Sequence, residues 1–126
     1  MNEQRLAPAN GFVELPDIDS LDRFLAQSNG APAIIFKHSN SCGISAGAYE
    51  EMAGLAGSVG LVTVQTARDV SNEIEARTGV EHHTPQVFII RDGKVMWTAS
   101  HGRISAASVA AALLEATGPA TVAQDG

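Results

Sequence analysis

The chain contains one cysteine, Cys42, and its setting in the sequence is that of a reactive thiol. An apolar run ends at Phe36, a polar segment follows over residues 38–41, and the apolar spacing of a helix begins just after Cys42. A helix N-terminus offers unpaired N–H groups and the positive end of the helix dipole, which stabilise a thiolate and lower the pKa of the thiol. We therefore interpret Cys42 as a nucleophile, the alternative being a small, buried apolar side chain.

The residues beside the thiol limit its chemistry. Ser45 occupies the place of the second cysteine in a Cys-x-x-Cys pair, where that thiol would resolve a mixed disulfide. Because a hydroxyl cannot form a disulfide, redox chemistry at Cys42 needs a thiol from another molecule. Ser45 could hydrogen-bond the thiolate or be an ordinary first-turn serine. Gly43 allows a partner backbone to approach closely, and we predict that Gly43 and Ser41 contact the substrate.

Thr84 and Pro85 directly precede a β-rich run at residues 86–91. Proline has no N–H group, so at the start of a strand it leaves an edge open, and its peptide bond can be cis. A cis bond would let the backbone of Thr84 pair with an extended thiol substrate beside Cys42; the alternative is a plain strand-entry proline. His38, four residues before the thiol, is expected to influence the thiolate. The histidines and the cysteine lack the usual spacing of metal ligands, so no metal is expected.

Size and charge restrict the class of protein. The 126 residues suit one domain, which we expect at 12–116 between a flexible lead at 1–11 and a flexible tail at 117–126. A net charge of −6 argues against nucleic acid or an anionic membrane as the main partner. No apolar stretch approaches the roughly 18 residues that span a bilayer, and the first residues lack the apolar core of a secretory signal. We therefore expect a cytoplasmic protein.

The spacing of apolar residues predicts helices alternating with strands, which implies parallel pairing through right-handed crossovers. The predicted strands lie at 33–36, 61–65, 86–91 and 94–99, the last two joined by an Asp92-Gly93 turn, with a further short strand or extended segment at 12–16. The first predicted helix lies around 21–25 and is capped by Asp17 or Asp19, and the second runs from 44 to 59 and is stopped by Gly60. The third ends near 77, is capped by Asp69 or Ser71, and has Gly79 after it. The fourth follows Ser105, and its apolar face is Ala106, Val109, Ala110, Leu113 and Leu114. This order matches an α/β, thioredoxin-like fold with a central mixed four-stranded sheet flanked by helices.

Several segments resemble the YtxJ family of the bacillithiol system, the monothiol bacilliredoxins. The resemblance runs from about residue 12 to 114 and includes Phe-Lys-His-Ser at 36–39, Cys42-x-Ile44-Ser45, Gly79-Val80-x-His82-x-x-Pro85-Gln86, Asp92-Gly93-Lys94-Val95 and Ser100-His101. It implies a thioredoxin-like fold, Cys42 as the nucleophile and Pro85 as a cis-proline facing it. It also implies a cytosolic role in low-molecular-weight thiol redox control.

The predicted function is thus monothiol thiol-disulfide exchange on S-thiolated client proteins, with a small thiol such as bacillithiol as co-substrate and no tightly bound cofactor. The family usually has proline after its cysteine, whereas this chain has Gly43. Cys-Gly-Ile-Ser is also similar to the Cys-Gly-Phe-Ser site of monothiol glutaredoxins, which implies an iron–sulfur cluster carrier as one alternative. A thioredoxin-like interaction module with an idle cysteine is the other.

Overall fold

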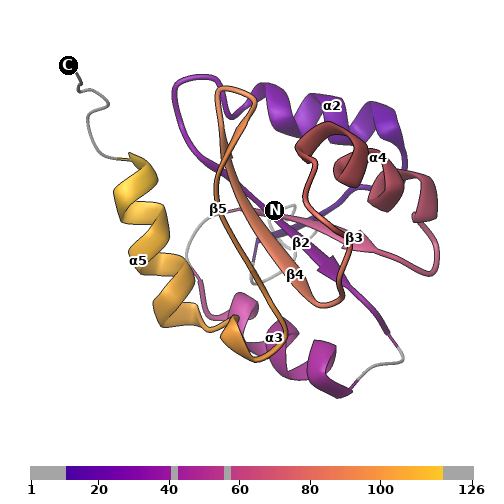
Figure 1. The fold of residues 1–126 in the computed structure, drawn as a ribbon, viewed down its shortest axis with the longest axis vertical. Helices are drawn as coiled ribbons and strands as arrows, with labels where there is room; N and C mark the ends of the chain where they lie inside the picture. Colours follow the sequence, from indigo (N-terminus) through magenta and orange to yellow (C-terminus); the bar gives the residue numbers. More distant parts are fainter. Residues whose placement is uncertain (1–10, 41–42, 56–57, 118–126) are drawn as a thin grey trace, which may run out of the picture.

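A computed structural model of the chain describes residues 11–40, 43–55 and 58–117 (Figure 1). The predicted lead and tail therefore lie outside the described residues, apart from Gly11 and Thr117. No helix in the described part is long and apolar enough to cross a membrane. The elements, in chain order, are β1 (Phe12–Glu14), α2 (Ile18–Ala26), β2 (Ala33–His38), α3 (Gly43–Ala53), β3 (Val59–Thr63), α4 (Arg68–Thr78), β4 (Gln86–Arg91), β5 (Lys94–Ser100), the short 3₁₀-helix η1 (His101–Arg103) and α5 (Ala106–Thr117).

The strands form one mixed sheet in the order β1-β3-β2-β4-β5. The strands β1, β3 and β2 are parallel to one another. β4 pairs with β2 in the antiparallel direction, and β5 pairs with β4 in the same way. The segment at 12–16 is thus a fifth strand, since Phe12 pairs with Val59 at the outer edge of β3. The thioredoxin-like α/β architecture predicted from the sequence is confirmed, with five strands in place of four.

Helices cover both faces of the sheet, two on each (Figure 1). Alternate residues of the buried strand β2 point to opposite faces, as the pleat requires. Ile34 and Phe36 belong to the core beneath α3 and α5, whereas Ile35 belongs to the core beneath α2 and α4. Every residue of β2 is buried, which explains the continuous apolar run in the sequence.

Local turn and cap chemistry confirms several of the predicted boundaries. Asp17 caps α2, accepting a hydrogen bond from the backbone N–H of Ser20 at 2.8 Å. Asp92 and Gly93 have the positive φ values, 54° and 77°, that the predicted hairpin turn requires. Ser105 precedes α5, and its Oγ accepts from the N–H of Ser108 at 3.0 Å.

The predicted boundary between the second helix and the second strand is wrong. The sequence prediction extended the helix to residue 59 and used Gly60 as its end, but α3 ends at Ala53 and both Val59 and Gly60 lie in β3. Gly60 serves close packing there: a Cβ at this position would lie 2.8 Å from the side chains of Leu15 and Phe24. Its role is therefore set by tertiary contacts that helix periodicity does not reveal.

Two further details differ from the sequence prediction. The residue before α4 is Ala67, which makes no side-chain cap, and the predicted caps Asp69 and Ser71 both lie inside the helix. The apolar face of α5 is rotated from the predicted one, since Leu114 is 74% exposed. The residues of α5 that pack on the core are instead Val109, Ala112, Leu113 and Ala116.

Hydrogen bonds join the tip of the β4–β5 hairpin to the loop after α2 and to α5. Asp92 accepts a hydrogen bond from the N–H of Gly30 at 2.8 Å, and its own N–H donates to the carbonyl of Ser28 at 2.8 Å. Arg91 donates from Nη1 to the carbonyl of Ala116 at 2.7 Å, near the end of α5. The hairpin tip thus links the loop after α2 with the last turn of α5.

Candidate functional site

The candidate site lies where β2 ends, α3 begins and the chain enters β4. His38 is the last residue of β2, and Gly43 is the first of α3. The antiparallel register pairs Lys37 with Gln86, which brings Pro85 next to the end of β2. The Thr84-Pro85 peptide bond is cis, the alternative that the predicted fold favoured. Segments far apart in the sequence therefore meet at one end of the sheet.

The helix predicted after the thiol is present, since α3 begins at Gly43. Cys42 is the residue immediately before it in the sequence. Cys42 and Ser41 lie outside the described residues, and the side chain of Ser45 lies outside them too. The roles given to these three residues, and the substrate contacts expected of Gly43 and Thr84, stay predictions.

His38 is buried, with 7% of its surface exposed, and lies among aromatic rings on the α3 face of the sheet. The centre of its ring is 4.9 Å from that of Tyr49 in α3 and 5.5 Å from that of Phe36. The packing fixes the ring between β2 and the first turns of α3. Sequence reasoning had selected His38 but missed Tyr49, whose spacing of seven residues from Cys42 gave a weak helical signal.

The loop before the thiol is held by a residue from the neighbouring strand connection. Gln65 donates from Nε2 to the hydroxyl of Ser39 at 2.9 Å and accepts from the N–H of Asn40 at 3.2 Å. The sequence prediction placed Gln65 at the end of a strand, but β3 ends at Thr63. Gln65 therefore lies beyond the end of β3, and both ends of its side-chain amide hydrogen-bond the loop that leads to Cys42.

Lys37 is a buried lysine that contacts the segment leading to Pro85. Lys37 is fully buried in β2, and its Nζ is 3.0 Å from Nδ1 of His82 and 5.7 Å from the centre of the Phe88 ring. The hydroxyl of Ser71, on α4, is 3.2 Å from the same His82 nitrogen. Burial lowers the pKa of Lys37 to about 8, and the nearby Glu75 carboxylate opposes that shift.

The pKa of His82 is lowered as well, first by desolvation and then by the charge of Lys37. A neutral imidazole with an unprotonated Nδ1 can accept hydrogen bonds from both the Lys37 ammonium and the Ser71 hydroxyl. The backbone N–H of His82 also donates to Glu75 Oε2 at 3.3 Å. The His82 segment is therefore held from β2 and from α4 at once.

Gln86, the first residue of β4, holds the same segment from the other end. Its side chain is almost fully buried, and Nε2 donates to the carbonyl of Glu81 at 2.9 Å while Oε1 accepts from the N–H of His83 at 3.3 Å. Lys37 and Gln86 are residues that the sequence prediction did not assign to the site. The available signal was a polar residue inside, or at the start of, an otherwise apolar strand.

The four histidines do not gather at one point. His83 and His101 approach each other edge to face, with ring centres 5.3 Å apart, whereas His38 packs against Tyr49. Within the described part of the chain, no three side chains of the metal-binding types come close enough to hold an ion. The histidines thus fall into three surroundings: His38 lies beside Tyr49, His82 lies beside Lys37, and His83 and His101 contact each other.

A helix that begins one residue after a cysteine, beside a cis-proline at the entry to a neighbouring antiparallel strand, defines the thioredoxin-like class of thiol redox proteins. The chain belongs to the monothiol bacilliredoxin BrxC family, whose sequence profile matches residues 13–109. The family resemblance seen in the sequence is thereby confirmed.

Solved structures agree with this assignment. A protein described as having a thioredoxin fold superposes with a TM-score of 0.76 at 30% identity, over 81% of this chain and 93% of its own. Thioredoxin from Fasciola hepatica has a TM-score of 0.66 at 14% identity, over 82% of this chain and 97% of its own. A mutant thioredoxin from Halobacterium salinarum has a TM-score of 0.67 at 13% identity, over 89% and 96% respectively, so these two thioredoxins show the fold alone.

Proposed function

We propose that the protein is a monothiol thiol-disulfide oxidoreductase that removes a low-molecular-weight thiol, such as bacillithiol, from S-thiolated client proteins. One observation carries the proposal: the only cysteine of the chain immediately precedes the first residue of α3, at the sheet end where cis Thr84-Pro85 enters β4. Membership of the monothiol bacilliredoxin family supports the same chemistry. The proposed setting is the cytoplasm, where protein thiols are kept reduced.

The reaction takes place in two exchange steps. The Cys42 thiolate attacks the small-thiol sulfur of the mixed disulfide, so that a Cys42–small-thiol disulfide forms and the client sulfur leaves as a thiolate, which takes up a proton. A second small thiol, as its thiolate, then attacks the disulfide on Cys42. That step releases the oxidised small-thiol dimer and restores the Cys42 thiolate. The net reaction converts the client mixed disulfide and one free small thiol into the free client thiol and the disulfide of two small thiols, and the protein itself is unchanged.

In this proposal the residues near Cys42 have distinct roles. Thr84 and Pro85 would lie along the disulfide substrate, with Ser41 and Gly43 as further contacts. The backbone N–H groups at the start of α3 would stabilise the thiolate. His38 and Ser45 would support the thiolate, His38 from its fixed place beside Tyr49.

The test is client de-thiolation with the wild-type protein and with Cys42→Ser, using a peptide mixed disulfide and an excess of the free small thiol. Release of the peptide thiol should be catalysed by the wild type and fall to the uncatalysed rate with Cys42→Ser. Lys94→Ala is the control, because it changes an exposed side chain at the hairpin tip, at the opposite end of β4 from Pro85, and should keep the wild-type rate. Equal rates for the wild type and Cys42→Ser would contradict the proposal.

The pKa of Cys42 gives a second measurement. The rate of alkylation against pH should report a thiol pKa below the free-thiol value of about 8.5, because α3 presents its N-terminus there. A pKa at or above that value would favour an idle cysteine.

A further inference from the structure

A groove of about 500 Å³ opens beside the segment that carries the cis-proline. One wall is the chain before β4, and the other is the end of β5 together with η1. The side chains that can carry or exchange charge are His83 and Glu81 on the first wall and His101 and Arg103 on the second. This groove is therefore accessible and carries charged and titratable side chains, and it has no role in the chemistry described so far.

The groove is connected to the candidate site through the backbone. The N–H of His101 donates to the carbonyl of Pro85 at 3.0 Å, and Ser100 pairs with Gln86 in the sheet. The 3₁₀-helix η1 also packs against α3, the helix that begins after Cys42. A molecule bound in the groove would thus lie next to the cis-proline segment, on the side away from the hairpin tip.

Arg103 brings a permanent positive charge to this groove, in a protein with a net charge of −6. Arg103 is exposed, and among the described residues no carboxylate lies within 4.0 Å of its guanidinium. His101 adopts a left-handed backbone, φ 55°, and its ring meets that of His83 at 5.3 Å. Such a conformation is disfavoured for residues other than glycine, and its cost is offset by the surrounding contacts.

One acidic side chain faces these groups. Glu81 Oε1 is 3.9 Å from Nε2 of His83, and the Glu81 side chain is 84% exposed. The groove therefore presents Arg103 and His101 on the wall formed by β5 and η1, and His83 and the exposed Glu81 on the wall before β4. This pattern suits a ligand with a carboxylate, and it leaves room for an ammonium group beside Glu81.

We propose that this groove binds the carboxylate of the small thiol whose disulfide is exchanged at Cys42, with Arg103 as the principal contact. The inference rests on the proposed function and adds the substrate class to it: a carboxylate-bearing thiol is preferred to a neutral one of similar size. A guanidinium can donate two parallel hydrogen bonds to a carboxylate. His83 and His101 add ring N–H donors to the same groove.

The experiment compares two mixed disulfides of one client peptide, one made with 3-mercaptopropionate and one with 2-mercaptoethanol. These thiols are similar in size and differ in charge. We expect the wild type to have the higher kcat/KM for the 3-mercaptopropionate adduct. Arg103→Ala should lower that value about tenfold, mainly through KM, which corresponds to about 1.4 kcal/mol. The value for the 2-mercaptoethanol adduct should stay unchanged.

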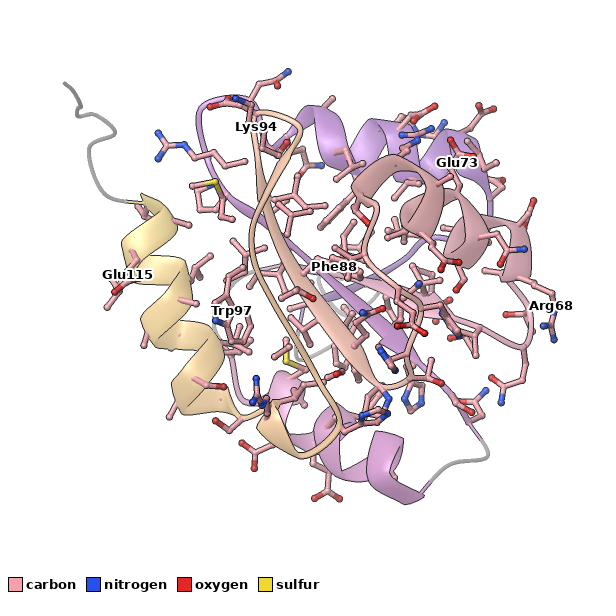
Figure 2. All side chains as sticks on the ribbon, in the orientation of Figure 1. Arg68, Glu73, Phe88, Lys94, Trp97 and Glu115 are labelled. Carbon is pink, nitrogen blue, oxygen red and sulfur yellow. The ribbon has the colours of Figure 1, made fainter. Side chains whose placement is uncertain are left out.

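Lys94→Ala is the matched control, since it removes one positive charge at the hairpin tip, at the far end of the sheet from the groove (Figure 2). It should leave both kcat/KM values at the wild-type level. Raising the salt concentration should reduce the preference of the wild type for the carboxylate, because exposed charges are screened. An equal loss on both adducts with Arg103→Ala, or no loss on either, would overturn the inference. Absence of turnover on both adducts with the wild type would instead contradict the proposed function.

Discussion

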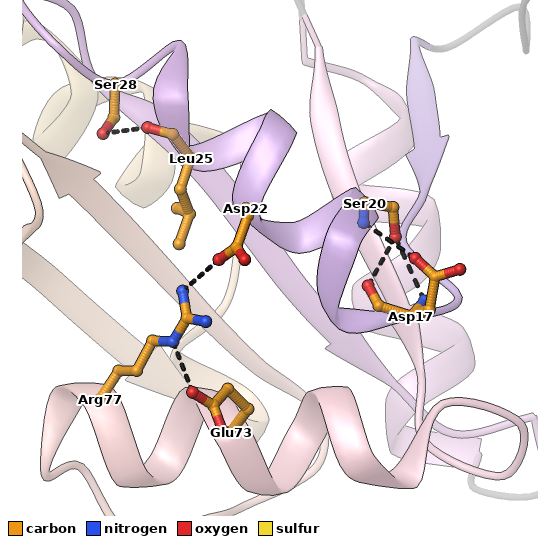
Figure 3. Close-up of polar contacts among 7 residues, drawn as sticks. All are labelled: Asp17, Ser20, Asp22, Leu25, Ser28, Glu73 and Arg77. Atoms are coloured by element: carbon orange, nitrogen blue, oxygen red, sulfur yellow. Dashed lines mark hydrogen bonds and ion pairs between the residues drawn. The ribbon is translucent and has the colours of Figure 1, made fainter.

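The two faces of the sheet are built differently. On the α2 and α4 face, Leu15 and Phe24 pack so closely on Gly60 that no Cβ fits there. Arg77 of α4 pairs with Asp22 of α2 and with Glu73 of its own helix, each at 2.7 Å (Figure 3). On the α3 and α5 face, small residues such as Ala48 and Ala116 pack against the strands. Gly47 of α3 has no atom within 4 Å of where its Cβ would be.

The helices on the two faces also differ at their N-termini. The α2 helix has a complete capping box, whereas the first turn of α3 contains no acidic residue that would offset its dipole. An uncompensated helix N-terminus leaves its positive end available to a bound or neighbouring anion. The N-terminus of α3 is therefore suited to the thiolate proposed at Cys42, the residue immediately before it in the sequence.

The largest expected effect concerns the closely packed face. Gly60→Val should lower the free energy of unfolding by about 3 kcal/mol, because the new side chain would overlap Leu15 and Phe24. Urea unfolding followed by circular dichroism measures this change. A loss below about 0.5 kcal/mol would show that the packing around β3 relaxes readily.

The next effect concerns the buried ammonium of Lys37. Its pKa is lowered to about 8 in the folded protein, from the ordinary value of 10.5, so the folded state binds fewer protons than the unfolded state between these pH values. Stability of the wild type should therefore rise with pH across this window. Lys37→Met should be more stable by about 2 kcal/mol below pH 8.

The advantage of Lys37→Met should shrink as the pH rises from about 8 toward 10.5, as Lys37 loses its proton in the folded state. Urea unfolding at several pH values gives this difference directly. Lys94→Met, which replaces an exposed lysine, is the control and should show no such trend. A pH-independent difference for Lys37→Met would argue that its ammonium is not destabilised by burial.

A smaller effect, which raises stability instead of lowering it, is expected for a substitution in α3. Gly47→Ala should raise the free energy of unfolding by about 0.5–1 kcal/mol, because alanine loses less backbone freedom in a helix and has open space here. Client de-thiolation should be unchanged. Destabilisation by Gly47→Ala would contradict the open space beside this position.

The smallest effect concerns the ion pairs of Arg77, which are partly exposed. Arg77→Ala should cost about 0.5 kcal/mol at low salt and less at high salt. A double-mutant cycle with Asp22→Ala isolates the contact between α2 and α4. A coupling energy of zero at low salt would leave packing alone to join these helices.

Much of the fold could be predicted because its signals are local. The Asp92-Gly93 turn depends on the φ values of two adjacent residues, and the Asp17 cap depends on an N–H group three residues away. The end of α3 and the start of β3 could not be predicted in this way. Val59 continues the apolar spacing of a helix, and the reason for Gly60 is a neighbour from α2, far away in the sequence.

The candidate site could be predicted in part for the same reason. The cysteine before a helix and the proline before a strand are visible in short segments of sequence, and α3 begins where expected. Lys37 and Gln86 gave no comparable signal, because a lysine in a strand is ordinarily exposed. Only the pairing of β2 with β4 brings these two residues together beneath the His82 segment.

The β4–β5 hairpin also bears on how the chain acquires its structure. Arg91 and Lys94 pair across a two-residue turn, whereas β2 joins β3 and β4 across long intervening segments. Closing so short a loop costs the least chain entropy of any strand pairing in the sheet. The hairpin is therefore the natural nucleus for the antiparallel half. Its opening strand begins directly after Pro85, and its closing strand ends at Ser100, directly before His101. Both walls of the groove are therefore continuous with the part of the sheet that can form first.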